Sequence, residues 1–258
     1  MNLSGETTVA VSGAFGRLGS LLCDVIEAHP DFALVAKLSR ASAPDAGSDA
    51  QIMVDATTPD ASSEVVARAL ARGQRVLVGT SGWTEERLAA LAILIAETPG
   101  AGVIVVPNFS LGSVLGTALA RAAAPFFEAI EIVEAHHPAK IDSPSGTAVR
   151  TAEVIAEARG GRPTVAPVVE QPARGQVVAG IPVHSLRLVG AVARQEVHFG
   201  GAGEVLTITH ETHSNEAYRA GISAALVAAR DARGLTVGLD AVLGLDRVSG
   251  FFAAGDSA

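Results

Sequence analysis

TVAVSGAFGRLG, residues 8–19, is the stretch of the sequence that decides the fold. Its apolar start, Thr8–Ser12, predicts a buried strand, and Arg17–His29, ended by a proline, predicts a helix. The turn between them has glycines at positions 13, 16 and 19, one residue away from the usual Gly-x-Gly-x-x-Gly spacing. Bare backbone there would let a pyrophosphate approach the helix amides. We therefore predict a dinucleotide-binding turn, the alternative being a tight strand-to-helix turn without a ligand.

Strands and helices alternate after this turn as far as residue 106. Buried or alternating apolar runs predict strands, and 3.6-residue periodicity bounded by Gly or Pro predicts helices. A small-residue loop, Ala41–Ala50, interrupts them. The rhythm predicts an α/β fold with a Rossmann-like doubly wound parallel sheet. The strands are expected at Phe32–Leu38, Ile52–Asp55, Val76–Gly79 and Val103–Val106, and the helices at Pro59–Arg72 and Thr84–Glu97.

The pattern changes after Asn108, which predicts a second, α+β domain on a mixed sheet. A Pro/Gly-rich stretch, Gly160–Pro182, precedes three closely spaced strands, and a final helix, Glu216–Arg233, is expected to return to the first domain. We assign residues 1–108 and 217–258 to the dinucleotide-binding domain and 109–216 to the second domain. The expected helices of the second domain are Leu111–Ala123 and Ser145–Ala158, and its strands are Ile130–His136, Pro182–Val189, Arg194–Phe199 and Glu204–His210.

Composition excludes several classes of protein. A net charge of -8, a pI near 5.3 and 4% aromatic residues argue against a nucleic-acid surface. The mean hydropathy of +0.36 comes from dispersed Ala and Val, and no apolar run reaches the roughly 20 residues of a membrane span. The start lacks a signal-peptide pattern, and Cys23 is the only cysteine, so it forms no internal disulfide. We expect a soluble cytoplasmic enzyme of small metabolites without a nucleic-acid or membrane partner.

EAHHPAKIDSPSGTA, residues 134–148, carries the chemical groups of a site. In an extended chain His136 and His137 lie on opposite faces of the sheet, so they are not expected to share a metal ion, and no metal site is predicted. Lys140 adds positive charge, and His136 has a side chain suited to proton donation near neutral pH. Each feature alone has a plainer reading, a packed histidine or an ordinary helix start, but together they favour a site for a small anion.

The same stretch predicts an anion-binding helix N-terminus. Ser143 is the expected N-cap, with Pro144 at the first helical position. Free backbone amides at a helix start bind carboxylate or phosphate. The amides expected to be free are those of Ser145, Gly146 and Thr147.

The end of the second strand bears on the choice of cofactor. NAD-binding proteins usually place an acid there, about twenty residues after the glycines, for the ribose hydroxyls. This chain has Ser39 and Arg40 instead, and a hydroxyl with a guanidinium suits a 2′-phosphate. We predict that NADPH is preferred, with NADH possible; the alternative is that Lys37 and Arg40 face solvent. Arg17 could also reach a phosphate.

Over nearly its whole length the chain resembles the 4-hydroxy-tetrahydrodipicolinate reductase (dihydrodipicolinate reductase) family of bacterial lysine and diaminopimelate synthesis, in particular its actinobacterial branch. Besides GAFGRLG and EAHHPAKIDSPSGTA, the resemblance rests on VDATTP (54–59), VGTSGW (78–83), VPNFSLG (106–112), HSLRLVGAVARQEVHFGGAGEVLTITHE (184–211) and GLTVGLDAVLGL (234–245). It implies reduction of a cyclic imine dicarboxylate to tetrahydrodipicolinate by hydride transfer from a nicotinamide. It also implies a homotetramer formed through the sheet of the second, substrate-binding and oligomerisation domain.

The resemblance implies a role for each matching residue. His136 corresponds to the family's proton donor, and Lys140 to its catalytic partner and charge anchor. His137, Ser145, Gly146 and Thr147 match the positions that hold the substrate carboxylates. The implied cofactor-binding residues are Gly13, Ala14, Phe15, Gly16, Arg17, Leu18, Ser39, Arg40, Thr57, Gly79, Thr80, Ser81, Pro107, Asn108 and Phe109.

Four positions depart from the family pattern. Ala56 replaces a usual aromatic and Thr58 a frequent basic residue, which could loosen contacts with the cofactor. Asn215 stands where an arginine is typical, and Tyr218 where a phenylalanine is usual. The main alternative function is an NADPH-binding sensor without turnover, which would have no need of His136 and Lys140. A semialdehyde dehydrogenase is disfavoured because the one cysteine lies far from the second domain.

Overall fold

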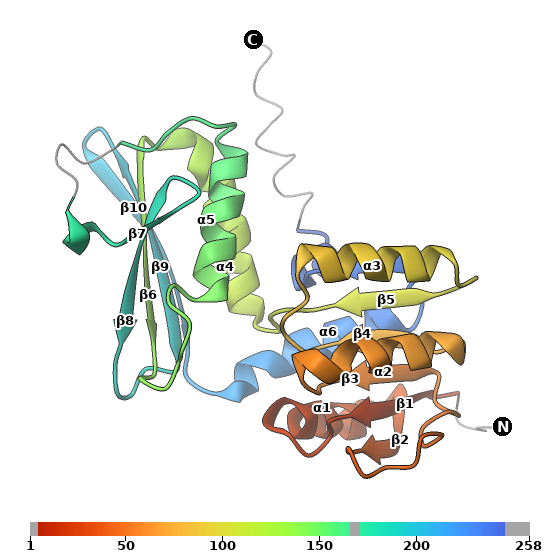
Figure 1. The fold of residues 1–258 in the computed structure, drawn as a ribbon. Helices are drawn as coiled ribbons and strands as arrows, with labels where there is room; N and C mark the ends of the chain where they lie inside the picture. Colours follow the sequence, from red (N-terminus) through yellow and green to blue (C-terminus); the bar gives the residue numbers. More distant parts are fainter. Residues whose placement is uncertain (1–4, 166–170, 246–258) are drawn as a thin grey trace. The chain divides into compact units, whose positions relative to one another are not determined.

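The computed structural model describes residues 5–165 and 171–245 (Figure 1). Contacts between Cα atoms divide the chain into two compact units. The first unit continues to Phe109 and resumes over Tyr218–Leu243, and the second spans Ser110–Ala217. Residues 166–170 of the predicted Pro/Gly-rich stretch, and the ends of the chain beyond these limits, lie outside the described residues.

The first unit is built on a six-stranded parallel sheet of order β11-β5-β4-β3-β1-β2, which confirms the predicted α/β fold. Helices α1 and α6 contact one another and pack against the sheet, and α2 and α3 flank it as well (Figure 1). The strands are β1 (Thr7–Ser12), β2 (Phe32–Leu38), β3 (Ile52–Asp55), β4 (Arg75–Val78), β5 (Gly102–Val105) and β11 (Gly234–Val237). The helices are α1 (Arg17–Ala28), α2 (Pro59–Ala71), α3 (Glu85–Ala96), α6 (Arg219–Ala229) and α7 (Leu239–Leu243).

The central strands form because their apolar runs are buried on both faces of the sheet. All four residues of β3 and of β5 are buried, as parallel sheets require. One core cluster joins strand residues such as Val76 and Val103 to Leu70 of α2 and Leu91 of α3. Strand β1 lies between β2 and β3, so the chain reverses its direction of winding there, and ligands of doubly wound sheets bind at such a switch point.

The second unit is built on a mixed sheet of order β10-β9-β6-β8-β7, as predicted. Strands β6 and β8 are parallel, and the other neighbours are antiparallel. Helices α4 and α5 pack on one face over a core that includes Ile132, Phe199 and Ile155. The elements are α4 (Leu111–Ala123), β6 (Ala129–His136), α5 (Gly146–Ala158), β7 (Gln176–Val178), β8 (Ile181–Arg187), β9 (Ala193–Gly201) and β10 (Glu204–Thr212), with short 3₁₀ segments at Ala124–Phe126 and Pro172–Arg174.

One predicted helix was wrong, and two short strands were not predicted. The Pro/Gly-rich stretch, in which no strand was predicted, contains β7, which forms because it pairs antiparallel with β8. The predicted helix Glu216–Arg233 is a 3₁₀ turn, Asn215–Tyr218, followed by the shorter α6. The residues directly after the predicted helix form β11, a four-residue strand held by parallel pairing with β5.

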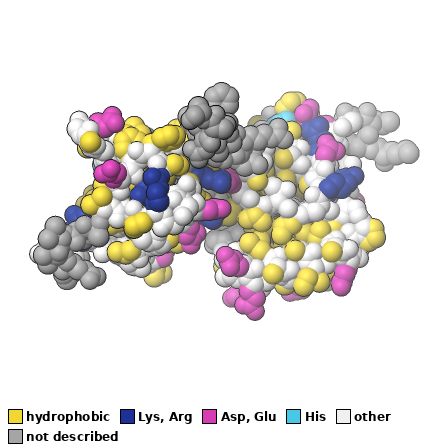
Figure 2. All heavy atoms as spheres, turned by 90° about the horizontal axis from the view of Figure 1, so that it is seen from above, with side chains coloured by type: hydrophobic (Ala, Val, Ile, Leu, Met, Phe, Trp, Pro, Cys, Tyr) yellow, Lys and Arg dark blue, Asp and Glu magenta, His cyan; other side chains and the backbone are white. Residues whose placement is uncertain are grey.

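Within the described residues, no helix combines the length and the apolar character needed to cross a bilayer. On the face drawn in Figure 2, lysine and arginine side chains lie in small groups among hydrophobic, uncharged and acidic atoms. That face therefore carries no continuous basic surface.

Candidate active site

The glycine turn of the first unit is a close crossing of backbone segments. Gly13 has φ +80°, and a Cβ there would lie 2.2 Å from the carbonyl oxygen of Ala56 at the end of β3. The Gly13 carbonyl oxygen accepts a hydrogen bond from the Gly16 amide at 3.1 Å. Gly16 is the N-cap of α1 and supplies no side chain to cap it, so the helix N-terminus is left bare. Such a bare N-terminus is the backbone arrangement that binds phosphate.

A cavity of about 660 Å³ opens beside this turn, at the carboxyl ends of β1 and β3. It therefore occupies the switch point of the sheet, and its volume lies within the usual range for ligand pockets. Phe15 is 73% exposed there and offers a flat apolar face. The lining includes these predicted cofactor residues: Gly13, Phe15, Gly16, Ser39, Arg40 and Thr57. A glycine turn, a hydroxyl and a guanidinium around one cavity fit the adenosine half of a dinucleotide.

The other predicted cofactor residues are placed differently within the same unit. Leu18, Gly79 and Phe109 meet, because a Cβ on Gly79 would lie 3.0 and 3.1 Å from the side chains of Phe109 and Leu18. The buried Thr80 donates its hydroxyl to the carbonyl oxygen of Asp55 at 3.4 Å. Ala14 is buried, Asn108 is half-buried, and Arg17, Ser81 and Pro107 are exposed.

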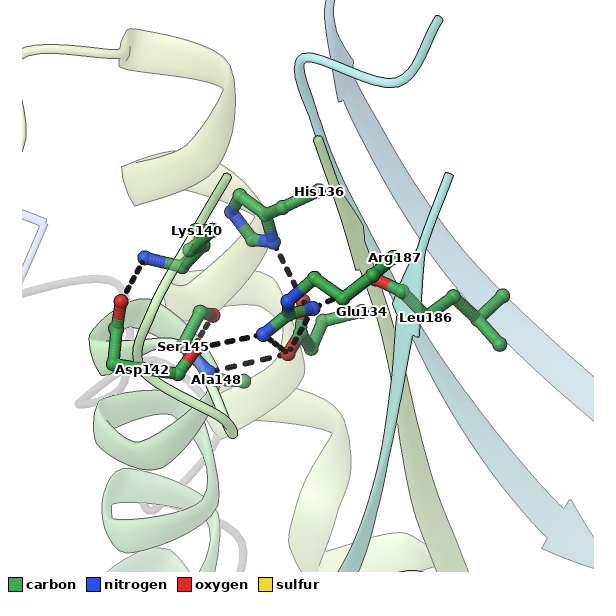
Figure 3. Close-up of polar contacts among 8 residues, drawn as sticks. All are labelled: Glu134, His136, Lys140, Asp142, Ser145, Ala148, Leu186 and Arg187. Atoms are coloured by element: carbon green, nitrogen blue, oxygen red, sulfur yellow. Dashed lines mark hydrogen bonds and ion pairs between the residues drawn. The ribbon is translucent and has the colours of Figure 1, made fainter. Parts of the chain in front are cut away.

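In the second unit, the central feature of the site is a buried carboxylate (Figure 3). Glu134 on β6 is fully buried, and its Oε2 lies 2.5 Å from Nδ1 of His136 on the same strand. Arg187 on β8 donates to both carboxylate oxygens at 3.0 Å. The backbone amide of Ser145 donates to Oε1 at 3.2 Å. The imidazole is therefore held through Nδ1, which leaves Nε2 as the nitrogen for proton transfer.

Burial and neighbouring charges set the pKa values of this pair. Burial raises the pKa of Glu134, but hydrogen bonds from Arg187, Ser185 and His136 outweigh it and hold that pKa below its ordinary value. Burial lowers the pKa of His136, and the cations Lys140 and Arg187 add to the effect against the opposing pull of Glu134. The imidazolium of His136 is thus a stronger acid than a free histidine.

Lys140 lies near this imidazole but points to a different partner (Figure 3). Its Nζ lies 2.8 Å from Oδ1 of Asp142, which also accepts a hydrogen bond from the Gly146 amide. Both contacts hold the pKa of Asp142 below its ordinary value, although burial opposes them. An internal carboxylate therefore already joins the ammonium to the first turn of α5.

The start of α5 differs from the sequence prediction. The N-cap is Ser145 and not Ser143, because the Ser145 hydroxyl accepts a hydrogen bond from the Ala148 amide at 3.2 Å. Pro144 therefore precedes the cap and is not the first helical residue. The predictions of free amides at Ser145 and Gly146 were also wrong, since Glu134 accepts from the first and Asp142 from the second. Gly146 is exposed and Thr147 half-buried at the first helical positions.

His137 lies one residue beyond the end of β6 and is exposed. The two neighbouring histidines therefore have different surroundings. Across the described parts of the chain, no three His, Cys, Asp or Glu side chains gather in a way that could hold a metal ion.

Comparison with known proteins accounts for both units. Residues 7–109 match the family described as dihydrodipicolinate reductase, N-terminus, and residues 112–243 match dihydrodipicolinate reductase, C-terminus. The chain belongs to the dihydrodipicolinate reductase family. The predicted family is thereby confirmed, and the first unit is the NAD(P)-binding domain of this family.

Individual relatives cover almost all of the chain. It is 56% identical over 241 residues to the 4-hydroxy-tetrahydrodipicolinate reductase of Clavibacter michiganensis, covering 93% of this chain and 87% of that protein. It is 43% identical over 245 residues to the reductase of Streptomyces coelicolor, covering 92% and 98%. A solved structure, dipicolinate-bound dihydrodipicolinate reductase from Paenisporosarcina sp. TG-14, superposes with a TM-score of 0.79 at 30% identity, covering 92% of this chain and 99% of that one.

Sequence reasoning missed several groups of this chain. Glu134 and Arg187 were quoted only as parts of motifs and were given no role. For Glu134 a signal existed, because residues two apart on a strand lie on the same face, which places Glu134 beside His136. In the first unit, Glu64, Arg68 and Arg72 of α2 and its flank line the cavity. Their spacing of four residues places them on one face of a helix, and this signal could have identified them.

Proposed function

We propose that the chain is a 4-hydroxy-tetrahydrodipicolinate reductase. It reduces the cyclic imine dicarboxylate derived from 4-hydroxy-tetrahydrodipicolinate to tetrahydrodipicolinate, with NAD(P)H, in the diaminopimelate route to lysine. The matches to both halves of the family and the relatives over more than nine-tenths of the chain support the activity. The observation that carries the chemistry is the imidazole of His136, held on Glu134 beside Lys140 and the start of α5.

The reaction adds a hydride and a proton to the substrate. When bound, the reduced nicotinamide supplies the hydride. His136 carries the proton on Nε2 and delivers it to the carbon skeleton, and its ring is then left neutral with Nδ1–H donated to Glu134. The lowered pKa of His136 favours this release of the proton.

A dicarboxylate substrate matches the positive groups around His136. The amides of Gly146 and Thr147 and the ammonium of Lys140 are the proposed carboxylate ligands, with His137 beside them. Ser145 contributes by capping α5, which orients the following amides. The related Paenisporosarcina reductase was solved with dipicolinate, a dicarboxylate on a six-membered ring, and this supports the ligand class.

NADPH is the proposed preferred cofactor, with NADH possible. Ser39 and Arg40 line the cavity beside the glycine turn, where an acidic residue would favour ribose hydroxyls. The remaining predicted residues, including Thr80, Ser81, Pro107 and Asn108, complete the proposed cofactor site. The first unit thus serves as the dinucleotide-binding domain and the second as the substrate-binding and oligomerisation domain. Ala56 and Thr58 also line the cavity, so these departures act on the same site.

A homotetramer formed through the sheet of the second unit is also proposed. Helices α4 and α5 cover only one face of that sheet. Exposed apolar side chains on its strands include Val177, Leu186 and Val205. Pairing of this face with another copy would remove them from water.

Substrate-dependent oxidation of NADPH and NADH tests the activity. The unstable substrate is generated in place from pyruvate and aspartate semialdehyde by its synthase. Oxidation that depends on both precursors is the expected result, faster with NADPH. Tight NADPH binding without oxidation would contradict the proposal and favour the sensor alternative.

A further inference from the structure

The carboxylate of Glu134 is unusual for its position on β6. The preceding inward-facing residues of the strand, Ile130 and Ile132, belong to the apolar core, and Glu134 continues their alternation. A fully buried carboxylate is costly, and an ion pair there is weak evidence for a role in stability. The contacts that Glu134 makes therefore point to another reason for its presence.

Both carboxylate oxygens of Glu134 make hydrogen bonds, and these bonds join β6, β8 and α5. Oε1 accepts from the Ser145 amide at the N-terminus of α5 and from Arg187 on β8. Oε2 accepts from Arg187 and lies 2.5 Å from Nδ1 of His136. Arg187 also donates to the carbonyl oxygen of Asp142 at 2.7 Å, in the loop that carries Lys140. One carboxylate thus connects the proposed acid to the proposed anion site.

One carboxylate and two cations surround His136 and act on its pKa in opposite directions. Glu134 from its own strand and Arg187 from β8 offset one another, and Lys140 approaches from the loop. The carboxylate orients the ring, while the guanidinium prevents that carboxylate from making the imidazolium too weak an acid.

We propose that Glu134 is a positioning residue of the reductase, which fixes the His136 ring through Nδ1 so that Nε2 carries the transferred proton. With Arg187 it also fixes that ring relative to the first turn of α5. The inference rests on the proposed function, because it assigns His136 the role of proton donor. Loss of a purely structural carboxylate would lower stability without lowering kcat or moving the pH profile of the reaction.

Glu134→Gln is the direct test, because it keeps the size of the side chain and removes its charge. A glutamine amide that donates to Nδ1 requires this nitrogen to be unprotonated, so it disfavours the imidazolium that acts as the acid. We expect kcat for substrate-dependent NADPH oxidation to fall about 100-fold or more, with KM changed far less. The loss of negative charge also lowers the pKa of His136 further, so the alkaline decline of kcat/KM moves to lower pH.

Glu131→Gln is the matched control. Glu131 lies on the same strand and its Oε2 lies 2.8 Å from Nε2 of His184, with Arg174 as a second partner. It thus forms a similar glutamate–histidine–arginine group without His136. This variant should retain the kcat and the pH profile of the unmodified protein.

Two further measurements keep the test decisive. If Glu134→Gln does not fold, Glu134→Asp keeps the charge for Arg187 but shortens the reach to His136, and it should lower kcat and shift the pH profile in part. NMR titration of the His136 ring needs no turnover, so it separates this inference from the proposed function. A folded variant with unchanged titration and pH profile, or with unchanged kcat, would overturn the proposal. Absence of activity in the unmodified protein would instead overturn the proposed function.

Discussion

Alanine substitutions in the glycine turn separate its role in folding from its role in binding. Gly13 has φ +80°, and its added Cβ would lie 2.2 Å from the Ala56 carbonyl oxygen. The left-handed conformation costs an alanine roughly 1–2 kcal/mol, partly offset by a less flexible unfolded chain. The backbone shift needed to relieve the clash adds about 1–3 kcal/mol to the loss of stability, as at other overpacked sites. Gly13→Ala should therefore destabilise the protein by about 2–4 kcal/mol and lower Tm by roughly 5–15 °C.

Two other glycines serve as matched controls. Gly73 has φ +73° and nothing within 4 Å of an added Cβ, so Gly73→Ala should cost only the conformational part, about 1 kcal/mol. Gly16 has φ -77°, and its added Cβ would make only an ordinary 3.4 Å contact with the Gly13 carbonyl oxygen. Gly16→Ala should keep Tm nearly unchanged but weaken NADPH binding at least about tenfold, near 1.4 kcal/mol, because a methyl group covers the helix N-terminus.

Calorimetry gives Tm, and titration of NADPH fluorescence gives Kd for the three variants. A Gly13→Ala protein as stable as Gly73→Ala would refute the reasoning about the backbone crossing. Unchanged NADPH affinity in Gly16→Ala would refute the assignment of the pyrophosphate to this turn.

Three further predictions concern the cofactor and the charges of the second unit. Arg40→Ala should weaken NADPH binding and leave NADH binding unchanged, because the arginine contacts only the 2′-phosphate, which NADH lacks. Equal effects in titrations of the two cofactors would place the 2′-phosphate elsewhere. Lys140→Ala should raise KM and lower kcat. Asp142→Asn should instead lower KM, because the substrate no longer competes with an internal carboxylate for the ammonium. Steady-state kinetics that show a higher KM in Asp142→Asn would contradict this. The pKa of His136 is lowered and its charged form is the acid, so kcat/KM should be constant at low pH and fall as pH rises through a value below the ordinary one of about 6.5. A profile that rises with pH across this range would exclude the imidazolium as the acid.

The first unit could be predicted well because its signals are local. Val103–Val105 is an apolar run buried on both faces, and Gly13 and Gly19 after β1 are required by close contacts between backbone segments. Strand β11 escaped prediction because its four residues pair with β5, more than a hundred residues away. The spacing of cavity residues such as Arg68 indicates a shared helix face, but the cavity that this face lines depends on the fold.

The site of the second unit shows the same limit. The sequence contains His136 and Lys140 in one motif, but the partner of Glu134, Arg187, lies 53 residues further along the chain. Two serines could have capped α5, and the choice of Ser145 depends on the amide that Glu134 binds from β6. Tertiary contacts therefore decide the details that a local pattern leaves open.

The central claim is that His136 is the proton donor of a reductase, and its neighbour offers the sharpest comparison. Kinetics of substrate-dependent NADPH oxidation should be measured for His136→Gln and His137→Gln. The account predicts that His136→Gln lowers kcat about 100-fold to 10,000-fold with little change in KM, the range expected for loss of a general acid. It predicts that His137→Gln mainly raises KM, since His137 is exposed beside the proposed carboxylate site. Equal changes in the two variants, or a loss confined to KM in His136→Gln, would contradict the account.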